Sequence, residues 1–417
     1  MNKILLLFFL SCLTTLGCRK HGEVIEQVPV DPNATNGLTF SEILGRPTNN
    51  SISMNALFNN SADVYWEYGT TSGTYNLKTT TGAATKDVPL VADFTGLTAN
   101  TKYFYRIRYR SSGSTSSYLS GTEHTFQTAR TVGSTFSFAI QADPHLDTNS
   151  DTASYSLTLK NILAKNPDFL IDLGDTFMSE KLSDHTQDGI TQRHLLLRNY
   201  FDNICHSVPL YLVIGNHEGE MGWEQNGTAN SMAVMASNTR NLHYPNPAPN
   251  SFYSGNSKSE NYVGLRKNYY AWEWGDAQFF VIDPYWFTTA KPGWGWTLGA
   301  EQYSWFKNAI TSSKAKYKFI FCHQIVGGNG NDARGGTEFV DFFEMGGKNL
   351  DGSYAFDTYR PGWGKPIHTL MKEYKATIYF HGHDHFYGKQ DKDGIVYQEV
   401  PIPTPTVTIP TRVLIVD

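Results

Sequence analysis

Six continuous apolar runs in the second two thirds of the chain constrain the fold most strongly. They cover residues 136–141, 169–174, 210–215, 279–283, 319–323 and 377–382. Long segments with helical character, such as Ser154 to Asn166 and Glu301 to Ser312, separate most of them. Apolar runs without polar alternation are typical of strands that are covered on both faces. The pattern therefore predicts a layered α/β domain over residues 131–417.

Residues 38–130 follow a different pattern. Apolar and polar side chains alternate in short segments such as 51–58 and 102–110, and Gly, Ser, Thr and Asn separate these segments. A period of two with frequent turns predicts an antiparallel β-sandwich. The stretch from Leu97 to Tyr103 resembles the tyrosine corner of fibronectin type III-like sandwiches. No residue of this domain is placed for chemistry, which favours a structural or binding module.

Charge and cysteine content exclude two classes of protein. The 417 residues carry 34 Lys and Arg against 39 Asp and Glu, a net charge of -5. Because affinity for a phosphate backbone requires clustered Lys and Arg, we expect no nucleic-acid-binding patch. Four cysteines are too few for a disulfide framework in a chain of this length. The two that lie in the predicted domains, Cys205 and Cys322, have apolar neighbours and are expected to be buried free thiols.

The first 18 residues have the pattern of an export signal. Lys3 precedes an apolar run that is too short to span a bilayer, and the segment ends at Gly17-Cys18. Leu16 to Cys18 resembles the lipobox of bacterial lipoproteins, in which the cysteine is acylated, although Thr15 departs from that motif. Residues 19–37 are expected to form a linker. We expect an exported bacterial lipoprotein, periplasmic or at the cell surface, with plain secretion as the alternative.

Polar residues follow five of the apolar runs, and their positions point to one site. The five motifs are Asp143-Pro144-His145, Gly174-Asp175, Gly215-Asn216-His217-Glu218, His323, and His381-Gly382-His383-Asp384-His385. In α/β sheets, the loops at the carboxyl ends of the strands form the ligand crevice. Each motif alone has an ordinary explanation: Asp-Pro is common in turns, and Asn216 could cap a helix. Taken together and in this order, they favour a shared site.

The order of these motifs resembles the calcineurin-like metallophosphoesterase superfamily. The preceding sandwich makes the chain similar to the purple acid phosphatase-like branch, which has an N-terminal fibronectin type III-like domain. The resemblance covers nearly everything from residue 40 to residue 400. It implies a four-layer αββα sandwich with two metal ions at one edge.

The resemblance also implies a role for each motif residue. Asp143, His145 and His385 would hold one metal, and Asn216, His323 and His383 would hold the other. Asp175 would bridge the two ions, with each carboxylate oxygen binding one. His217 would contact the phosphoryl oxygens and protonate the leaving group, and Glu218 would hold its orientation. His381 is expected to support or pack against the ligands.

The implied activity is that of a metal-dependent phosphoric ester hydrolase. The mixed oxygen and nitrogen ligands suit two divalent transition metals, with Zn, Mn or Fe expected. A metal-bound hydroxide would attack the phosphorus of a small phosphate monoester directly. Two features depart from purple acid phosphatases: Met178 stands where they carry a Tyr ligand, and His145 is an additional ligand. We therefore expect a colourless enzyme.

Two other functions remain open at this stage. The same two-metal site could serve a phosphodiesterase or nucleotide pyrophosphatase, because the loops decide the substrate. The chain could also be a non-catalytic surface binding lipoprotein, although the intact ligand set argues against this. Nothing in the sequence specifies the oligomeric state.

Three long, glycine-rich loops are candidates for substrate recognition. Arg334 and Arg360 could clamp phosphate, since a guanidinium matches two phosphoryl oxygens, and His243 could approach substrate. The tryptophans of the segments 292–296 and 361–364 either fold their loops onto the domain or form an aromatic wall for the leaving group. We favour the first of these two possibilities.

Overall fold

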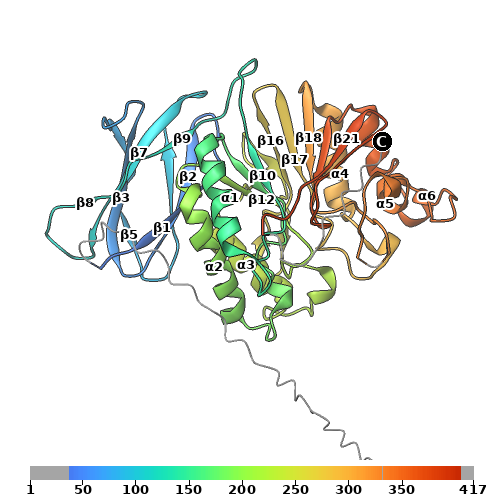
Figure 1. The fold of residues 1–417 in the computed structure, drawn as a ribbon, viewed down its shortest axis with the longest axis horizontal. Coiled ribbons are helices and arrows are strands. Elements are labelled where there is room, and N and C mark those ends of the chain that lie inside the picture. Colours follow the sequence, from blue (N-terminus) through green and yellow to red (C-terminus); the bar gives the residue numbers. More distant parts are fainter. Residues whose placement is uncertain (1–36, 331, 405–417) are drawn as a thin grey trace, which may run out of the picture.

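The computed structural model describes residues 37–330 and 332–404. It places a β-sandwich beside a larger domain built from helices and two sheets (Figure 1). The predicted export segment, Cys18 and nearly all of the predicted linker lie outside the described residues. Among the described residues, no helix is long and apolar enough to cross a bilayer.

The N-terminal sandwich consists of two antiparallel sheets. One contains β1 (Phe40–Gly45), β2 (Ser51–Phe58) and β6 (Leu90–Thr95). The other contains β3 (Ala62–Gly69), β4 (Leu77–Lys78), β5 (Gly82–Ala84), β7 (Lys102–Ser111), β8 (Leu119–Ser120) and β9 (His124–Gln127). The alternating apolar side chains of β2, β3 and β7 form its core, as the period of two predicts. Tyr103 accepts a 2.9 Å hydrogen bond from the backbone N–H of Thr98, as in a tyrosine corner.

The first sheet does not end with the sandwich. Gly45, at the end of β1, pairs in parallel with Leu210 of β12, so one six-stranded sheet runs from the sandwich into the α/β domain. Gly45 allows this junction because a Cβ atom there would overlap Pro245 and the carbonyl oxygen of Leu210. The two predicted domains therefore share a sheet.

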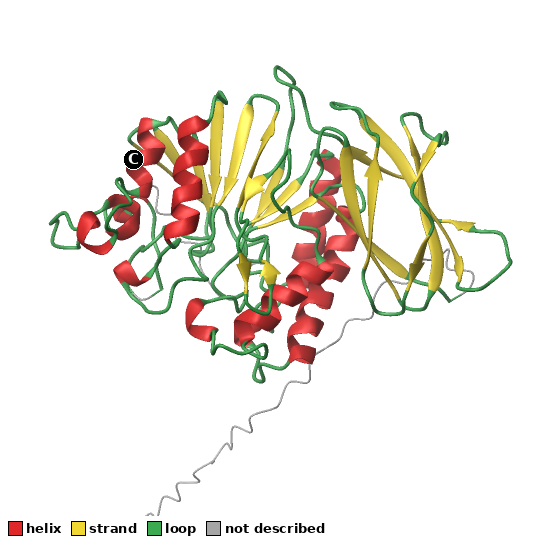
Figure 2. Cartoon of the chain, turned by 180° about the vertical axis from the view of Figure 1, so that it is seen from behind, coloured by secondary structure: helices red, strands yellow, loops and turns green. Residues whose placement is uncertain are grey.

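The α/β domain has four layers, helix, sheet, sheet and helix (Figures 1 and 2). The first sheet contributes the parallel strands β10 (Ala139–Gln141), β11 (Leu170–Asp172) and β12 (Leu210–Leu212). The second sheet has seven strands in the order β13 (Ser254–Gly255), β16 (Tyr270–Trp274), β17 (Ala277–Val281), β18 (Tyr317–Phe321), β19 (Ile378–His381), β21 (Ile395–Glu399) and β20 (Gly388–Lys392). A separate hairpin pairs β14 (Ser259–Glu260) with β15 (Gly264–Leu265).

Helices cover the outer face of each sheet. The helices α1 (Thr152–Lys165), α2 (Gln187–Cys205) and α3 (Met232–His243) lie on the side of the first sheet. On the side of the second sheet lie α4 (Ala300–Ser312), α5 (Phe343–Gly346), α6 (Phe356–Tyr359) and α7 (Ile367–Glu373). Short 3-10 turns occur at η1 (Ser179–Lys181), η2 (Gly222–Glu224), η3 (Gly293–Gly295) and η4 (Thr337–Phe339). The two helices expected from sequence correspond to α1 and α4 within two residues at each end.

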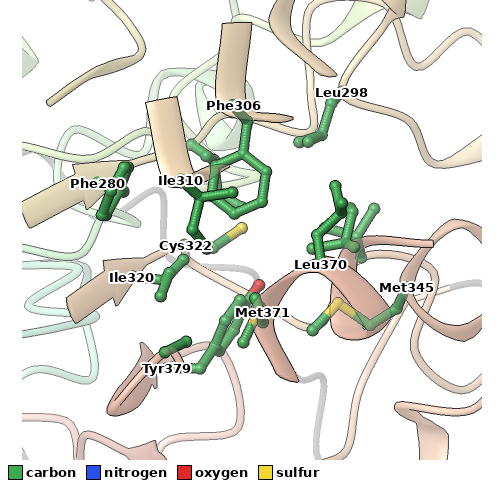
Figure 3. Close-up of a cluster of buried hydrophobic side chains, with 14 of the residues drawn as sticks. Phe280, Leu298, Phe306, Ile310, Ile320, Cys322, Met345, Leu370, Met371 and Tyr379 are labelled. Atoms are coloured by element: carbon green, nitrogen blue, oxygen red, sulfur yellow. The ribbon is translucent and has the colours of Figure 1, made fainter. Parts of the chain in front are cut away.

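Three apolar cores hold the layers together. Aromatic side chains fill the space between the two sheets, where Phe169 meets Trp272 edge-on and Trp272 stacks on Phe279. A second core lies between the first sheet and α1 and α2. A third lies between the second sheet and the helices α4 and α7, where Phe306 and Ile310 meet Ile320 and Leu370 (Figure 3). Cys205 and Cys322 are buried free thiols, as predicted.

Candidate metal centre

The five polar motifs lie at the carboxyl ends of five strands. Asp143 and His145 follow β10, Asp175 follows β11, and Asn216 follows β12 in the first sheet. His323 follows β18, and His383 and His385 follow β19 in the second sheet. Within each sheet these strands are parallel, so their carboxyl ends meet at one edge. The two sheets face each other, and their loops therefore meet above the central core.

Six of the seven predicted ligands form two groups. Asp143, His145 and His385 make one group, and Asp175, His323 and His383 make the other, with the ligand atoms of each group within 4.8 Å of one another. The seventh, Asn216, lies beside the second group, with its Oδ1 3.1 Å from Nε2 of His323. The structure thus brings together all seven residues in the two sets that the motif order implies.

Each aspartate divides its two oxygens between backbone and cluster. Oδ2 of Asp143 accepts the N–H of His383, and Oδ1 of Asp175 accepts the N–H of His217. The other oxygen of each faces imidazoles: Oδ1 of Asp143 lies 3.4 Å from Nε2 of His385, and Oδ2 of Asp175 lies 3.2 Å from Nε2 of His323. The carboxylates therefore fix neighbouring loops and present one oxygen each to the cluster.

The two oxygens of Asp175 have different surroundings. Oδ1 accepts the backbone N–H of His217, and Oδ2 lies between the groups, 3.8 Å from Nε2 of His145 and 3.2 Å from Nε2 of His323. That each oxygen binds one ion stays a prediction.

Hydrogen bonds set the orientation of two imidazoles. Nδ1–H of His323 donates to the carbonyl oxygen of Leu173 at 3.0 Å, which turns Nε2 toward the aspartates. His383 is turned the other way, since its Nε2–H donates to the carbonyl oxygen of Asp332 at 2.5 Å and its Nδ1 faces His323. Such outer contacts fix which nitrogen is free to bind a metal. His381 is not in the cluster and pairs with Glu399 at 2.5 Å.

The backbone at the site is strained and closely packed. Five of the seven ligands have positive φ angles, namely Asp143, His145, Asp175, His383 and His385. Such conformations are uncommon for residues other than Gly and cluster at functional sites. A Cβ atom at Gly382 would overlap the carboxylate of Asp143, and one at Gly215 would overlap the backbone of Asp175. These glycines are required for the close approach of the loops.

The charges of the site are strongly coupled. Burial lowers the pKa of His323, but the carboxylates of Asp175 and Asp143 outweigh burial and raise this pKa to about 10. Burial also lowers the pKa of His145, but the neighbouring carboxylates of Asp143 and Asp175 outweigh burial and raise this pKa to about 9. Burial raises the pKa of each aspartate, but His323 and the other neighbouring imidazoles together outweigh burial, and both pKa values are lowered. Cations are thus strongly favoured next to these carboxylates.

The residues fit a pair of divalent metal ions. Oδ1 of Asp143 and Nε2 of His145 are buried and have no hydrogen-bond partner among the described residues, and both belong to the first group. Leaving two buried polar atoms unsatisfied is unfavourable, and a shared cation would satisfy both. The mixture of carboxylate, imidazole and amide donors suits transition metals.

His217 lies at the mouth of this cluster, with its Nε2 3.9 Å from Oδ2 of Asp175. Its partner is not the predicted one. Nδ1 of His217 lies 2.7 Å from Oε2 of Glu180, a residue that the sequence analysis did not single out. The carboxylate of Glu218 points the other way, because consecutive side chains project in different directions. A signal for Glu180 existed, since it lies in the same loop as Asp175.

Glu218 is a buried scaffold for two of the motifs. Its carboxylate accepts backbone N–H groups from Asp175 at 3.0 Å, from Thr176 at 2.6 Å and from Phe177 at 3.1 Å, and a further short bond from Gly215. It therefore ties the loop after β11 to the loop after β12. The prediction that Glu218 orients His217 was wrong.

The three predicted substrate-binding residues have different surroundings. Arg334 is half-exposed next to the ligands, and its Nη1 donates to the carbonyl oxygen of His383 at 2.9 Å and to Oδ1 of Asp384 at 3.1 Å. Arg360 is bound to Glu344 and to the carbonyl oxygens of Trp294 and Trp296, which corrects its prediction as a phosphate clamp. His243 is 3% exposed at the end of α3, so burial keeps it from contacting substrate.

The tryptophans of the segments 292–296 and 361–364 fold their loops onto the domain, which is the possibility that we favoured over an aromatic wall. Trp294 stacks on Tyr359, Trp363 stacks on Tyr303, and Trp296 is buried. A shallow surface hollow of about 450 Å³ lies elsewhere, between β13 and α4, and none of the predicted ligands lines it.

Comparisons with known proteins agree with this geometry. A family model described as calcineurin-like phosphoesterase matches residues 136–387, which is more than half of the chain. Purple acid phosphatase PPD1 from yellow lupin (Lupinus luteus) seeds is similar in structure, with a TM-score of 0.57 and 15% identity. That match covers 89% of this chain and 66% of the lupin chain, so this chain spans just under two thirds of the length of the lupin protein.

At 15% identity, the similarity to the lupin phosphatase shows a shared fold only. Phosphopantetheinyl hydrolase from Mycobacterium tuberculosis has a TM-score of 0.31 at 13% identity, covering 64% of this chain and 90% of that chain. No curated protein matches the sequence significantly.

Proposed function

Because the chain belongs to the calcineurin-like phosphoesterase family, we propose that it is a dinuclear-metal phosphatase that hydrolyses phosphate monoesters. The observation that carries this proposal is the convergence of the two ligand groups around Asp175, with His217 at their edge. The purple acid phosphatase-like fold supports the preference for monoesters. Zn, Mn or Fe ions suit the donor set best.

The ions, when bound, supply the Lewis acid that polarises the phosphoryl group and activates the attacking water. Asp143, His145 and His385 would hold one ion, Asn216, His323 and His383 would hold the other, and Asp175 would be a ligand of both.

The chain's own groups position the substrate and move a proton. Nε2 of His217 faces the cluster, and Glu180 accepts from Nδ1–H and so holds the orientation of the ring. His217 would donate its Nε2 proton to the departing oxygen. Arg334 keeps its guanidinium half-exposed while Nη1 is anchored, and would hold a phosphoryl oxygen beside His383.

Metal removal and replacement test this proposal. We expect chelation to abolish hydrolysis of a phosphate monoester and Zn²⁺, Mn²⁺ or Fe²⁺ to restore it, with near two ions per chain by metal analysis. Asp175→Asn should lose at least about a hundredfold in activity and bind less metal, while circular dichroism shows that it is folded. Metal-loaded protein without any esterase activity would contradict the proposal.

The same assay shows whether the enzyme prefers phosphate monoesters or diesters. A bis-aryl phosphate is compared with the aryl phosphate under identical metal loading. A faster rate with the diester would show that the protein is a phosphodiesterase and not a phosphomonoesterase.

We also propose that the protein is exported and anchored by acylation of Cys18. Only the signal-like first 18 residues support this, and they lie outside the described residues. Cys18→Ala should shift the protein from the membrane fraction to the soluble fraction of cells. Retention in the membrane fraction would contradict the anchor.

A further inference from the structure

One exposed tryptophan lies in the turn that follows the His217 loop and has no role in the proposed chemistry. Trp223 belongs to η2, the turn that follows the His217 loop, and 39% of its surface is exposed. The other tryptophans of the long loops pack against the domain. The surroundings of Trp223 show how it is placed.

The turn that carries Trp223 is fixed next to the second ligand group. Gly222 donates its N–H to the carbonyl oxygen of Tyr285 at 3.0 Å, and the ring of Tyr285 lies 6.4 Å from the ring of His323. Met221 packs with Tyr285 and Ala333 in a small buried cluster. This cluster supports η2 from beneath, directly beside the metal ligands.

The indole itself is held by two neighbours. The ring of Trp296 meets it edge-on at 5.7 Å, and the ammonium of Lys291 lies 5.3 Å from its centroid. Lys291 also lies 3.5 Å from Oδ1 of Asp332, the residue whose carbonyl oxygen binds His383. Through these contacts Trp223 is connected to the loops that carry His217 and His383, and part of its surface stays exposed.

We propose that Trp223 is a stacking surface for a planar aromatic leaving group. The inference rests on the proposed phosphatase function and names its substrate class: phosphate monoesters of phenols or of nucleosides, in preference to alkyl phosphates. Aromatic rings gain from stacking on indole, whereas an alkyl group gains little. Lys291 keeps the indole in place and adds a positive charge that favours anionic esters.

Matched variants and substrates test the proposal. In Trp223→Ala, kcat/KM for phenyl phosphate or adenosine 5′-monophosphate should fall about five- to tenfold, and that for glycerol 3-phosphate should stay within twofold. Trp223→Phe should retain most of the preference. Tyr317→Ala is the control, because Tyr317 is equally exposed but lies at the opposite end of β18. If kcat/KM falls more for phenyl phosphate, the leaving group is a phenol; if it falls more for adenosine 5′-monophosphate, the leaving group is a nucleoside.

A binding measurement separates this inference from the proposed function. Phenylphosphonate and methylphosphonate cannot be hydrolysed at an ester bond, and calorimetry gives their Kd with metal-loaded protein. We expect Trp223→Ala to weaken phenylphosphonate about fivefold or more and to leave methylphosphonate unchanged. Equal effects on both ligands, or none on either, would overturn the stacking role even in an active phosphatase. Binding selectivity without turnover of any ester would instead overturn the phosphatase function.

Discussion

At the scale of single residues, the site is built from side chains that perform two tasks at once. Asp143 and Asp175 each fix a neighbouring loop with one oxygen and face the imidazoles with the other. Glu180 and Glu218 have different roles: Glu180 contacts the imidazole of His217, and Glu218 accepts hydrogen bonds from backbone N–H groups. The two glutamates should therefore respond differently to the same substitution.

Replacing Glu180 by Gln should impair proton donation. The side chain keeps its shape, but a neutral amide accepts less strongly from Nδ1–H than a carboxylate and holds the His217 ring less firmly, so we expect kcat to fall about 10- to 100-fold for alkyl phosphates. The loss should be smaller for 4-nitrophenyl phosphate, because a good leaving group needs less protonation. Steady-state kinetics with both substrates measures this difference.

Glu218→Gln is the contrasting variant. The NH2 end of the introduced side-chain amide is a donor and would face backbone N–H donors, so for Glu218→Gln the free energy of unfolding should fall by about 1–3 kcal/mol, as measured by urea denaturation. An equal loss of kcat for both leaving groups in Glu180→Gln would show that Glu180 has only a structural role.

At the scale of elements, five strands of the α/β domain bring their motifs together because their carboxyl ends lie at the same edge. β1 has another task, since it belongs to the sandwich but joins the sheet of the larger domain. Its Glu42 is 3% exposed, and Oε1 accepts the Nε1–H of Trp66 at 2.6 Å. Burial, partly opposed by this bond, raises the pKa of Glu42 to about 8.

This pKa predicts a stability that depends on pH. A carboxyl group with a raised pKa in the folded state contributes fully below its unfolded pKa of 4.5, and the contribution is lost as pH rises through about 8. Glu42→Gln should therefore raise the free energy of unfolding at pH 9 by roughly 3–5 kcal/mol relative to the parent, with little difference at pH 4. Urea denaturation at the two pH values measures it. The same difference at both pH values would refute the assignment to Glu42.

At the scale of the whole molecule, the sandwich and the α/β domain are joined by more than a linker. The buried guanidinium of Arg198 on α2 donates to Ser41 on β1, to Asn55 on β2 and to the carbonyl oxygen of His243. Tyr105 of β7 donates to the carbonyl oxygen of His206 at 2.5 Å. Together with the shared sheet, these contacts make the sandwich part of the support for the helices behind the metal centre.

We therefore expect both domains to unfold together. Scanning calorimetry of the full chain should show one transition, and Arg198→Met should lower the free energy of unfolding by about 3 kcal/mol without splitting it. Arg110→Ala, which removes a partly exposed ion pair with Asp63, is the control and should change stability by less than about 1 kcal/mol. Two separate transitions in the parent would contradict this coupling.

Much of the fold could be predicted because it depends on local periodicity. Unbroken apolar runs indicated strands covered on both faces, and alternation in segments such as 51–58 indicated the sandwich. The ligands were also accessible, because parallel strands bring their carboxyl ends to one edge and the order of the motifs resembled a known family. The extension of the first sheet through Gly45 and Leu210 was not predictable, since a single pair of residues 165 positions apart leaves no periodic signal.

By itself, the sequence determined the two kinds of domain, the strand ends that carry the ligands and the metal chemistry that these residue types suit, because these properties follow from neighbouring residues. Only the tertiary structure decided which carboxylate holds His217 and which oxygen of Asp175 lies between the ligand groups. It also decided that Arg360 and His243 are engaged in packing while Trp223 stays exposed. These outcomes depend on the direction in which a side chain leaves a turn. That direction is set by backbone conformation and by neighbours from distant parts of the chain.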